Sequence, residues 1–234
     1  MPVLVLTAVE VEAHRLAHHL RLAPAADATW PHYRSGAIEV MCVGLRADLL
    51  ATRAADACLA ASALVVSAGA CGALDPGLRR GDLVIPRVVI GPAGVRHEVD
   101  TIPALHGRGA LLTVAEVAQT AAIKTRLWME TGAVAVDMES APIVEWARGA
   151  GRRVAVVRAV SDTAQQAIPA DVAALVDAGG RVRPGQALRA ALARPRAIAD
   201  ALALGRGADA ALRTVAAALG TLARMSRDSD RPNE

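Results

Sequence analysis

Val134-Ala135-Val136-Asp137-Met138-Glu139-Ser140 and Val154-Ala155-Val156-Val157-Arg158-Ala159-Val160-Ser161-Asp162-Thr163 are the two stretches that decide the fold of this chain. In each, an apolar run with strand character ends in acidic and hydroxyl residues. Two buried strands therefore deliver carboxylates to one edge of a sheet, and such an edge is where open α/β sheets bind their ligands.

The residues between the two runs predict a helix that joins the strands. Ser140 can cap this helix, Pro142 suits its first turn, and Gly149 offers a stop before the second strand. Because β-α-β crossovers are almost always right-handed, we expect parallel strands whose carboxyl ends bring Glu139 and Asp162 together.

Each motif also has a simpler interpretation. Asp137 and Glu139 could merely decorate a helix N-terminus, where the dipole favours anions, while Ser161 and Asp162 cap the next segment. For either motif alone this interpretation is favoured. Two such ends on adjacent strands favour a binding site instead.

Composition limits the class of protein. The 234 residues suit a single domain, which we place at 1–225 with a core at 1–165 and a helical extension at 166–225. The opening Met1–Thr7 lacks a basic leader and predicts a buried strand, and no stretch is long enough to cross a bilayer. Three widely spaced cysteines fit a reducing compartment, so we expect a cytoplasmic protein. The absence of Phe and the single lysine, Lys124, are interpreted as base-composition bias.

Apolar runs and Ala-rich helical stretches alternate along the chain, which predicts a layered α/β domain. A turn at Tyr33–Ile38 indicates antiparallel strands and therefore a mixed sheet. The expected strands are Val3–Thr7, Ile38–Val43, Ala63–Ala68, Leu83–Ile90, Ala110–Val114, Ala133–Asp137 and Val154–Val160, and the expected helices are Glu10–Leu20, Asp48–Ala61 and Pro142–Ala150.

The C-terminal part has a different character. Between Arg181 and Arg224 there are eight Arg and two acidic residues, and Leu and Val recur there at helical spacing. This predicts a basic amphipathic helix that packs on the sheet, contacts an anionic membrane from the side, or covers a bulky apolar substrate. We expect the polar tail, 226–234, to be disordered.

Two further segments could carry chemistry. The glycine-rich Ser67–Pro76 follows a strand, and its small residues and N–H groups could receive an oxygen-rich ligand. Near the start, Glu10, His14 and His18 could in principle hold a metal, but two His on a helix are usually solvated. We expect neither a metal nor a cofactor, and no base can be named that would make Cys71 a nucleophile.

Taken together, these motifs resemble the purine nucleoside phosphorylase and nucleosidase superfamily over roughly residues 1–165. The matching segments are Ala8–Glu12, Ser67–Pro76 followed by Gly81-Asp82, Val136–Glu139 and Ser161-Asp162. The resemblance implies a three-layer α/β/α sandwich with a central mixed β-sheet, and an assembly of two or more copies.

The methylthioadenosine and adenosylhomocysteine nucleosidases supply residue roles by resemblance. Glu12 matches the carboxylate that activates water, and Asp162 the acid that protonates the purine. Glu139 matches the group that holds the ribose hydroxyls, and Met138 the one beneath the sugar. Gly69, Ala70 and Ser161 complete the substrate-binding residues that the resemblance implies. Such acid and base groups suit an oxocarbenium-like transition state.

The nucleophile and the substrate are less constrained by the sequence. Phosphorylases of this superfamily bind phosphate with Gly and Arg in the first loop, whereas this loop carries Glu10 and Glu12, whose charges repel phosphate. Arg46 could still reach an anion. The methylthioadenosine nucleosidases, which this chain resembles, use an aromatic residue against the base and carry a hydroxyl residue at the position of Ala70. Because this chain has no Phe, we expect the Thr113–Ala118 segment to contact the base through aliphatic side chains.

The Thr131–Ser140 run, Arg194-Pro195 and the basic C-terminal end resemble the branch associated with hopanoid biosynthesis. The resemblance implies that adenine is removed from adenosylhopane to leave ribosylhopane. The alternatives are a methylthioadenosine or adenosylhomocysteine nucleosidase, a phosphorylase, and a nucleoside-binding protein without activity. The last is disfavoured by the full set of acid and base residues. The Arg-rich end lacks interleaved aromatics, so we expect no nucleic-acid partner.

Overall fold

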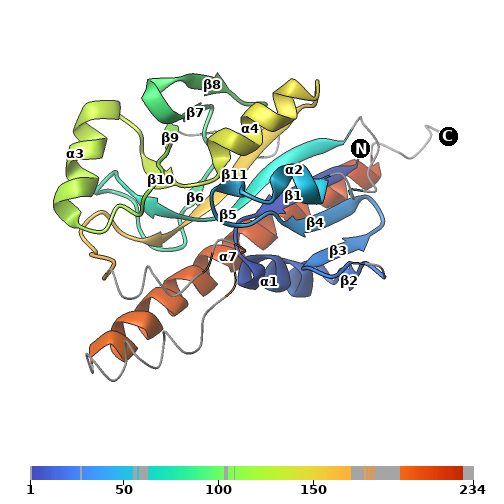
Figure 1. The fold of residues 1–234 in the computed structure, drawn as a ribbon, viewed down its shortest axis with the longest axis horizontal. Coiled ribbons are helices and arrows are strands. Elements are labelled where there is room, and N and C mark those ends of the chain that lie inside the picture. Colours follow the sequence, from blue (N-terminus) through green and yellow to red (C-terminus); the bar gives the residue numbers. More distant parts are fainter. Residues whose placement is uncertain are drawn as a thin grey trace.

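The computed structural model describes residues 2–26, 28–54, 57, 63–102, 105–107, 109–169, 177, 179, 181 and 196–228. In these residues a central mixed sheet has helices on both faces, which confirms the expected three-layer α/β/α architecture (Figure 1). Among the described helices, none is long and apolar enough to span a membrane.

Every apolar run expected to be a strand forms one, although Leu83–Ile90 divides in two around Pro86, which has no N–H to donate. The strands are β1 Val3–Thr7, β2 Ala23–Pro24, β3 His32–Ser35, β4 Ile38–Cys42, β5 Leu64–Ala73, β6 Leu83–Val84, β7 Val88–Ile90, β8 Arg96–Glu98, β9 Ala110–Thr113, β10 Ala135–Asp137 and β11 Val154–Asp162. The helices are α1 Glu10–Leu20, α2 Leu50–Ala54, α3 Ala121–Thr131, α4 Ser140–Gly149 and α7 Arg196–Asp228, with 3-10 turns η1 Leu45–Ala47 and η2 Pro92–Gly94. Most of the expected helix beyond Ala54 lies outside the described residues.

Alternation along the strands builds a core on each face of the sheet. Val3 and Val5 of β1 pack toward α1 and α7, whereas Leu4 and Leu6 pack toward α2 and α4. Side chains of a strand point to opposite faces in turn, so one apolar strand supplies both cores. This explains why the central strands are apolar throughout rather than alternating with polar residues.

The apolar side of α7 is buried against the sheet and α1. Its Leu212, Val215, Leu219 and Leu222 are at most 4% exposed and belong to the same core as α1. The packing interpretation of the C-terminal helix is therefore confirmed. α7 also continues to Asp228, beyond the end at 225 that we expected, and residues 229–234 lie outside the described part.

The strand β5 is the centre of the sheet. β11 runs parallel to it along one side, and on the other side β1 is parallel but β10 is antiparallel. The expectation that β10 and β11 are parallel neighbours is wrong, because β5 lies between them and they run in opposite directions. The ends of β10 and β11 still face each other, across β5 rather than along one edge.

Candidate active site

The hydrogen-bond ladder on one side of β5 is interrupted in the middle of the strand. β1 pairs with β5 as far as Ser67, and β10 pairs with it from Gly72. Between these points the N–H of Ala70 donates to Glu12 Oε1 over 2.9 Å. Because a buried backbone donor needs a partner, the carboxylate completes the hydrogen bonding where no strand does. The glycine segment is thus part of a strand, and this N–H serves Glu12 rather than a ligand.

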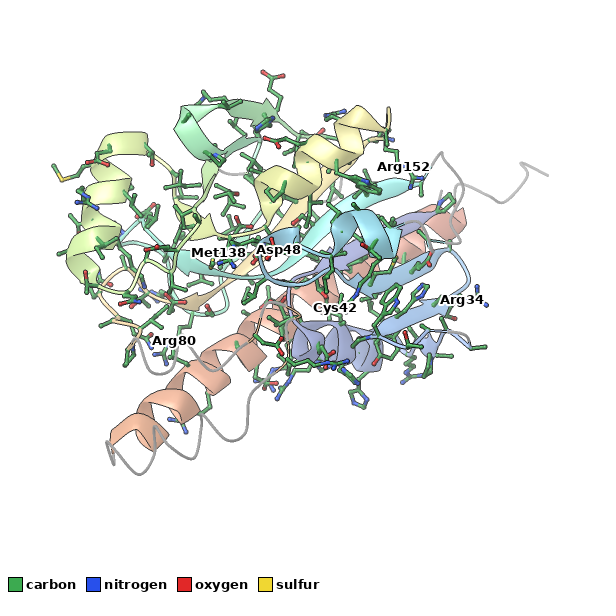
Figure 2. The ribbon with its side chains drawn as sticks, in the orientation of Figure 1. Arg34, Cys42, Asp48, Arg80, Met138 and Arg152 are labelled. Carbon is green, nitrogen blue, oxygen red and sulfur yellow. The ribbon has the colours of Figure 1, made fainter. Side chains whose placement is uncertain are left out.

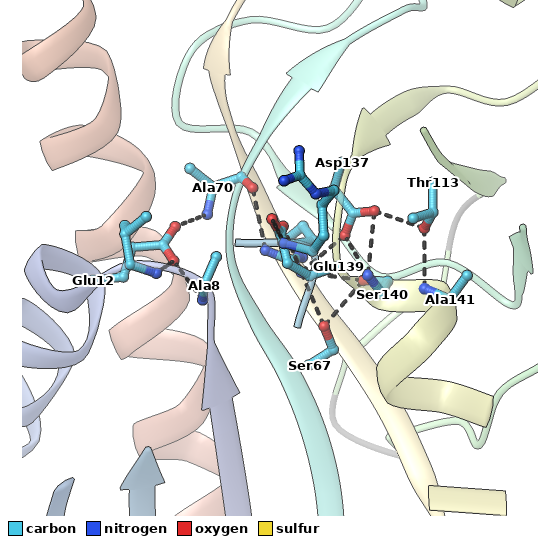
Figure 3. A network of polar contacts seen from close by, with 12 residues as sticks. Ala8, Glu12, Ser67, Ala70, Thr113, Asp137, Glu139, Ser140 and Ala141 are labelled. Carbon is cyan, nitrogen blue, oxygen red and sulfur yellow. Dashed lines mark hydrogen bonds and ion pairs between the residues drawn. The ribbon is translucent and has the colours of Figure 1, made fainter. Parts of the chain in front are cut away.

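Glu12 is fixed by both of its oxygens. Oε2 accepts hydrogen bonds from the N–H groups of Ala8 at 3.1 Å and Val9 at 3.4 Å, where α1 begins (Figure 3). Burial raises the pKa of Glu12, although Arg158 and the three N–H donors act in the opposite direction. A carboxyl group whose pKa is raised toward neutrality suits a general base.

Gly69 allows Glu12 and Arg158 to meet beside β5. A Cβ atom at Gly69 would lie 2.6 Å from Glu12 Oε1 and 2.7 Å from Arg158 Nη1, closer than real contacts allow. Its φ of +153° is also one that other residues rarely adopt. Gly69 is therefore a requirement of this close approach.

Arg158 is the buried cation of the site. Its Nη2 lies 2.8 Å from Asp137 Oδ2 and 3.8 Å from Glu139 Oε2, and it donates to Ser67 Oγ over 2.9 Å. Burial alone would lower the pKa of Arg158, but the surrounding carboxylates raise it. The guanidinium thus balances a group of carboxylates that could not be buried as ions without it.

Asp137 and Glu139 have different surroundings. Asp137 accepts from Thr113 Oγ1 at 2.7 Å and from the Ser140 N–H at 3.2 Å, so it supports the start of α4, as the simpler interpretation predicted (Figure 3). Glu139 accepts from the Arg46 N–H at 3.2 Å. Burial, together with Asp137 and Glu12, raises the pKa of Glu139 to about 7 despite Arg158.

A cavity of about 160 Å³ opens beside these groups. Met138 and Glu139 line it from the end of β10, and Ser161 and Asp162 line it from the end of β11. Figure 2 shows Met138 near the middle of the molecule. The remaining wall is largely aliphatic, as expected for a chain without Phe, and includes Val114, Val117, Ala118, Val136 and Ile168.

Asp162 lines this cavity and is 3% exposed. Its Oδ1 is 2.6 Å from Ser161 Oγ, and its Oδ2 is 2.5 Å from Lys124 Nζ. A Cβ at Gly72 would approach Oδ2 to 3.0 Å, so this second glycine leaves room for the carboxyl group. The carboxyl groups of Asp162 and Glu139 are therefore both part of the cavity wall.

The comparisons with known proteins agree with this geometry. The sequence profile of the phosphorylase superfamily matches residues 95–203, a segment that holds β10, α4 and β11. This segment is therefore similar to the phosphorylase superfamily. No curated protein sequence matches the chain.

Solved structures with the superfamily fold cover nearly the whole chain. The 5'-methylthioadenosine nucleosidase of Arabidopsis thaliana has a TM-score of 0.66 at 17% identity, over 100% of this chain and 98% of that one. The 5'-methylthioadenosine/S-adenosyl homocysteine nucleosidase of Helicobacter pylori has a TM-score of 0.67 at 13% identity, over 96% and 98%. The futalosine hydrolase of Helicobacter pylori has a TM-score of 0.63 at 14% identity, over 92% and 95%. At these identities the likeness concerns the fold.

Within the superfamily fold, the predicted site residues fall into two groups. Ala70, Met138, Glu139, Ser161 and Asp162 line the cavity. Glu12 and Gly69 are not in the cavity wall, but both are next to Ala70, which is. Glu12 accepts a hydrogen bond from the Ala70 N–H, and Gly69 precedes Ala70 in β5. Three carboxyl groups from distant segments are thus gathered around β5.

Sequence reasoning assigned no role to two residues of the site. Arg158 stands in the middle of an apolar strand, and a charged residue there signals a buried partner. Lys124 was attributed to composition, yet it is fully buried against Asp162. For the metal alternative, no cluster of three suitable side chains is found in the described part of the chain.

The raised pKa of Glu139 makes stability depend on pH. Its carboxyl has an ordinary pKa of 4.5 and a pKa of about 7 in the folded protein. As pH rises through this interval the unfolded chain loses the proton first, so the folded state loses stability. We expect the thermal midpoint to fall between pH 5 and pH 8, and the fall to be smaller in Glu139→Gln.

Differential scanning calorimetry across this interval measures the effect. Glu130→Gln, at a carboxylate that is 60% exposed on α3, is the control and should keep the wild-type slope. An unchanged slope in Glu139→Gln would mean that Glu139 is not the group that titrates.

Proposed function

We propose that this protein is a nucleosidase that cleaves the N-glycosidic bond of an adenosine-type nucleoside and releases adenine. The observation that carries the proposal is the gathering of Glu12, Glu139 and Asp162 around the middle of β5, beside a mainly aliphatic cavity. The superfamily fold and the nucleosidases that share it give further support.

In this mechanism the purine occupies the aliphatic part of the cavity. Asp162 donates a proton to N7 of the purine, which makes the base a better leaving group. The bond between C1' and N9 breaks, its electron pair goes to the purine, and positive charge develops on the ribose. Glu139, in the cavity wall, binds the ribose hydroxyls and lies close to the developing charge.

Glu12 acts as the base toward water. Its carboxyl is held by three backbone N–H groups, so it does not need to move when it accepts a proton. Water attacks C1' and transfers a proton to Glu12, which leaves ribose with a new hydroxyl group. Preorganised groups of this kind avoid the cost of reorganisation during the reaction.

Water is favoured over phosphate as the nucleophile. Arg158 is already surrounded by Asp137, Glu139 and two hydroxyl groups, and Glu12 lies next to it. The Arg46 guanidinium is 3.7 Å from Asp48 and half exposed. A phosphate dianion would therefore be repelled by three carboxyl groups. Neither of these two arginines could attract it, because each is already paired with a carboxylate.

For the substrate we propose adenosylhopane, which would be converted to ribosylhopane. The support is the sequence resemblance of Thr131–Ser140 and the C-terminal end to the hopanoid-associated branch. The buried apolar side of α7 packs on the sheet, so a membrane contact of this helix would have to use its basic side. Methylthioadenosine and adenosylhomocysteine are the alternative substrates.

Adenine release is the decisive measurement. The purified protein is offered adenosylhopane, methylthioadenosine and inosine, each with and without phosphate, and the free base is measured by chromatography. We expect adenine from adenosylhopane at a rate that does not depend on phosphate. Adenine only from the small nucleosides would reject the hopanoid substrate, and a requirement for phosphate would reject hydrolysis. A bound purine with no turnover would reject the enzyme itself.

A further inference from the structure

Lys124 is the only lysine among the 26 basic Lys and Arg residues of this chain. It lies in the first turn of α3 with no exposed surface. Its Nζ donates to Asp162 Oδ2 at 2.5 Å, to the Thr163 carbonyl at 2.9 Å and to the Gln166 carbonyl at 3.0 Å. An ammonium group has three N–H donors, and each has an acceptor here, so the geometry is that of a charged lysine.

A structural role does not account for this arrangement by itself. A buried ion pair is usually no more stabilising than well-packed apolar side chains of similar volume. Lys124 does connect α3 to the turn after β11, but the two carbonyls could do so with an uncharged donor. The contact that requires a charge is the one with Asp162, whose carboxyl lines the cavity.

Lys124 and Ser161 hold the two oxygens of Asp162 in different ways. Ser161 Oγ is 2.6 Å from Asp162 Oδ1 and 3.1 Å from the carbonyl oxygen of Cys71. A hydroxyl group has one hydrogen, so Ser161 can donate fully to only one of these two acceptors at a time. Oδ2 accepts from Lys124, which leaves Oδ1 as the oxygen that can carry the proton for the purine.

We propose that Lys124 is the positioning residue for the acid Asp162, an inference that rests on the proposed function. Lys124 orients the carboxyl group and stabilises its ionised form once the proton has left. In this step the O–H bond at Oδ1 breaks, an N–H bond forms at N7 of the purine, and the glycosidic electron pair passes to the base. The remaining carboxylate is paired with the ammonium, which keeps its own three protons.

The other groups near Asp162 do not supply this charge. Burial raises the pKa of the Cys71 thiol on β5, so it stays neutral, and Ser161 is uncharged. Asp137 on β10 and Glu12 on α1 are carboxyl groups gathered around Arg158. In the described part of the chain, Lys124 is the cation in contact with Asp162.

The choice of lysine in an arginine-rich chain fits the same role. The three acceptors surround one nitrogen atom, which suits a compact ammonium group. A guanidinium is a planar fork and is larger, so it cannot replace the ammonium at this position without moving Asp162 or the turn.

The test compares two leaving groups. The nucleoside is adenosylhopane or methylthioadenosine, whichever the wild type cleaves, because its purine must be protonated. The second substrate, 4-nitrophenyl β-D-riboside, has a leaving group that needs no proton. We expect Lys124→Met to lower kcat for the nucleoside by roughly 10²-fold, at the lower end of what a general acid contributes, with KM changed less than about threefold. Cleavage of the nitrophenyl riboside should stay within about threefold of wild type. Asp162→Asn should show the same selectivity.

Lys124→Gln is a second variant that covers the case that the methionine variant does not fold. Its amide can still donate to the carbonyl groups of Thr163 and Gln166 but carries no charge. We expect it to lose activity on the nucleoside and to keep cleavage of the nitrophenyl riboside, as Lys124→Met does. Thermal midpoints identify any variant that is unfolded under the assay conditions.

The outcomes separate this inference from the proposed function. If wild-type protein releases adenine from neither adenosylhopane nor methylthioadenosine, the nucleosidase assignment and the role of Lys124 both fail. If wild type is active but Lys124→Met and Lys124→Gln lose both substrates equally, or keep both, only the role of Lys124 is rejected.

Discussion

Replacing Glu12 by Gln is expected to lower kcat for adenine release by roughly 10²- to 10⁴-fold, the range that a general base contributes. The amide cannot accept the proton of the attacking water. It also cannot satisfy the N–H groups of Ala8, Val9 and Ala70 in the way that a carboxylate does, because its NH₂ group must face at least one of these donors. Binding of the product adenine should change little, because Glu12 is not in the wall of the cavity that would take the base.

Glu10→Gln is the matched control for this variant. Glu10 is on the same helix, but its carboxylate is 2.9 Å from the Arg181 guanidinium near the surface. We expect it to keep kcat within about threefold of wild type, as is usual for surface changes away from a site. Steady-state kinetics and the thermal midpoint of both variants separate lost catalysis from lost folding. Equal losses in the two variants would remove Glu12 from the mechanism.

Arg158→Met is expected to cost about 3–5 kcal/mol of folding free energy, the usual effect of removing one partner of a buried ion pair. Arg158 is 1% exposed and faces the carboxyl groups of Asp137, Glu139 and Glu12. Methionine fills much of the volume but leaves these carboxyl groups buried without a cation. The loss should be smaller at pH 5 than at pH 8, because protonation of Glu139, whose pKa is about 7, removes one of the charges.

Arg153→Met is the control at the start of the same strand. Its side chain is 55% exposed and lies 3.4 Å from Asp100, so its contribution should be within about 1 kcal/mol. Urea denaturation at the two pH values gives both free energies. A loss of 1 kcal/mol or less in Arg158→Met would show that the carboxyl groups do not depend on this cation.

Periodicity and spacing predicted much of the fold. Each predicted apolar run contains a strand, whereas the short β2 and β8 have no such run, and α7 packs as its spaced Leu and Val residues indicated. The pairing of the strands could not be predicted in the same way. β5 is longer than its apolar run, because Gly69, Ala70 and Gly72 have no large side chain and leave no periodic signal. Its extra length separates β10 from β11.

The candidate site was predictable where a motif ends a strand, as at Glu139 and Asp162. Long-range contacts are not encoded in local patterns. The N–H groups of Arg46 and Ala70 hold Glu139 and Glu12 from segments far away in the sequence. Arg158 could have been recognised, since an arginine inside an apolar strand is rarely without a buried partner. Lys124 was harder to recognise, because a single residue has no pattern.

The rarity of lysine gives this protein a built-in chemical probe. Apart from the amino terminus of the chain, amine-specific reagents have one target, and its Nζ is buried against Asp162 and two carbonyl groups. Labelling of Lys124 therefore requires α3 to separate from the end of β11. The labelling rate, measured by mass spectrometry, shows how often the cavity opens at Lys124 and Asp162. A ligand that fills the cavity should slow this labelling.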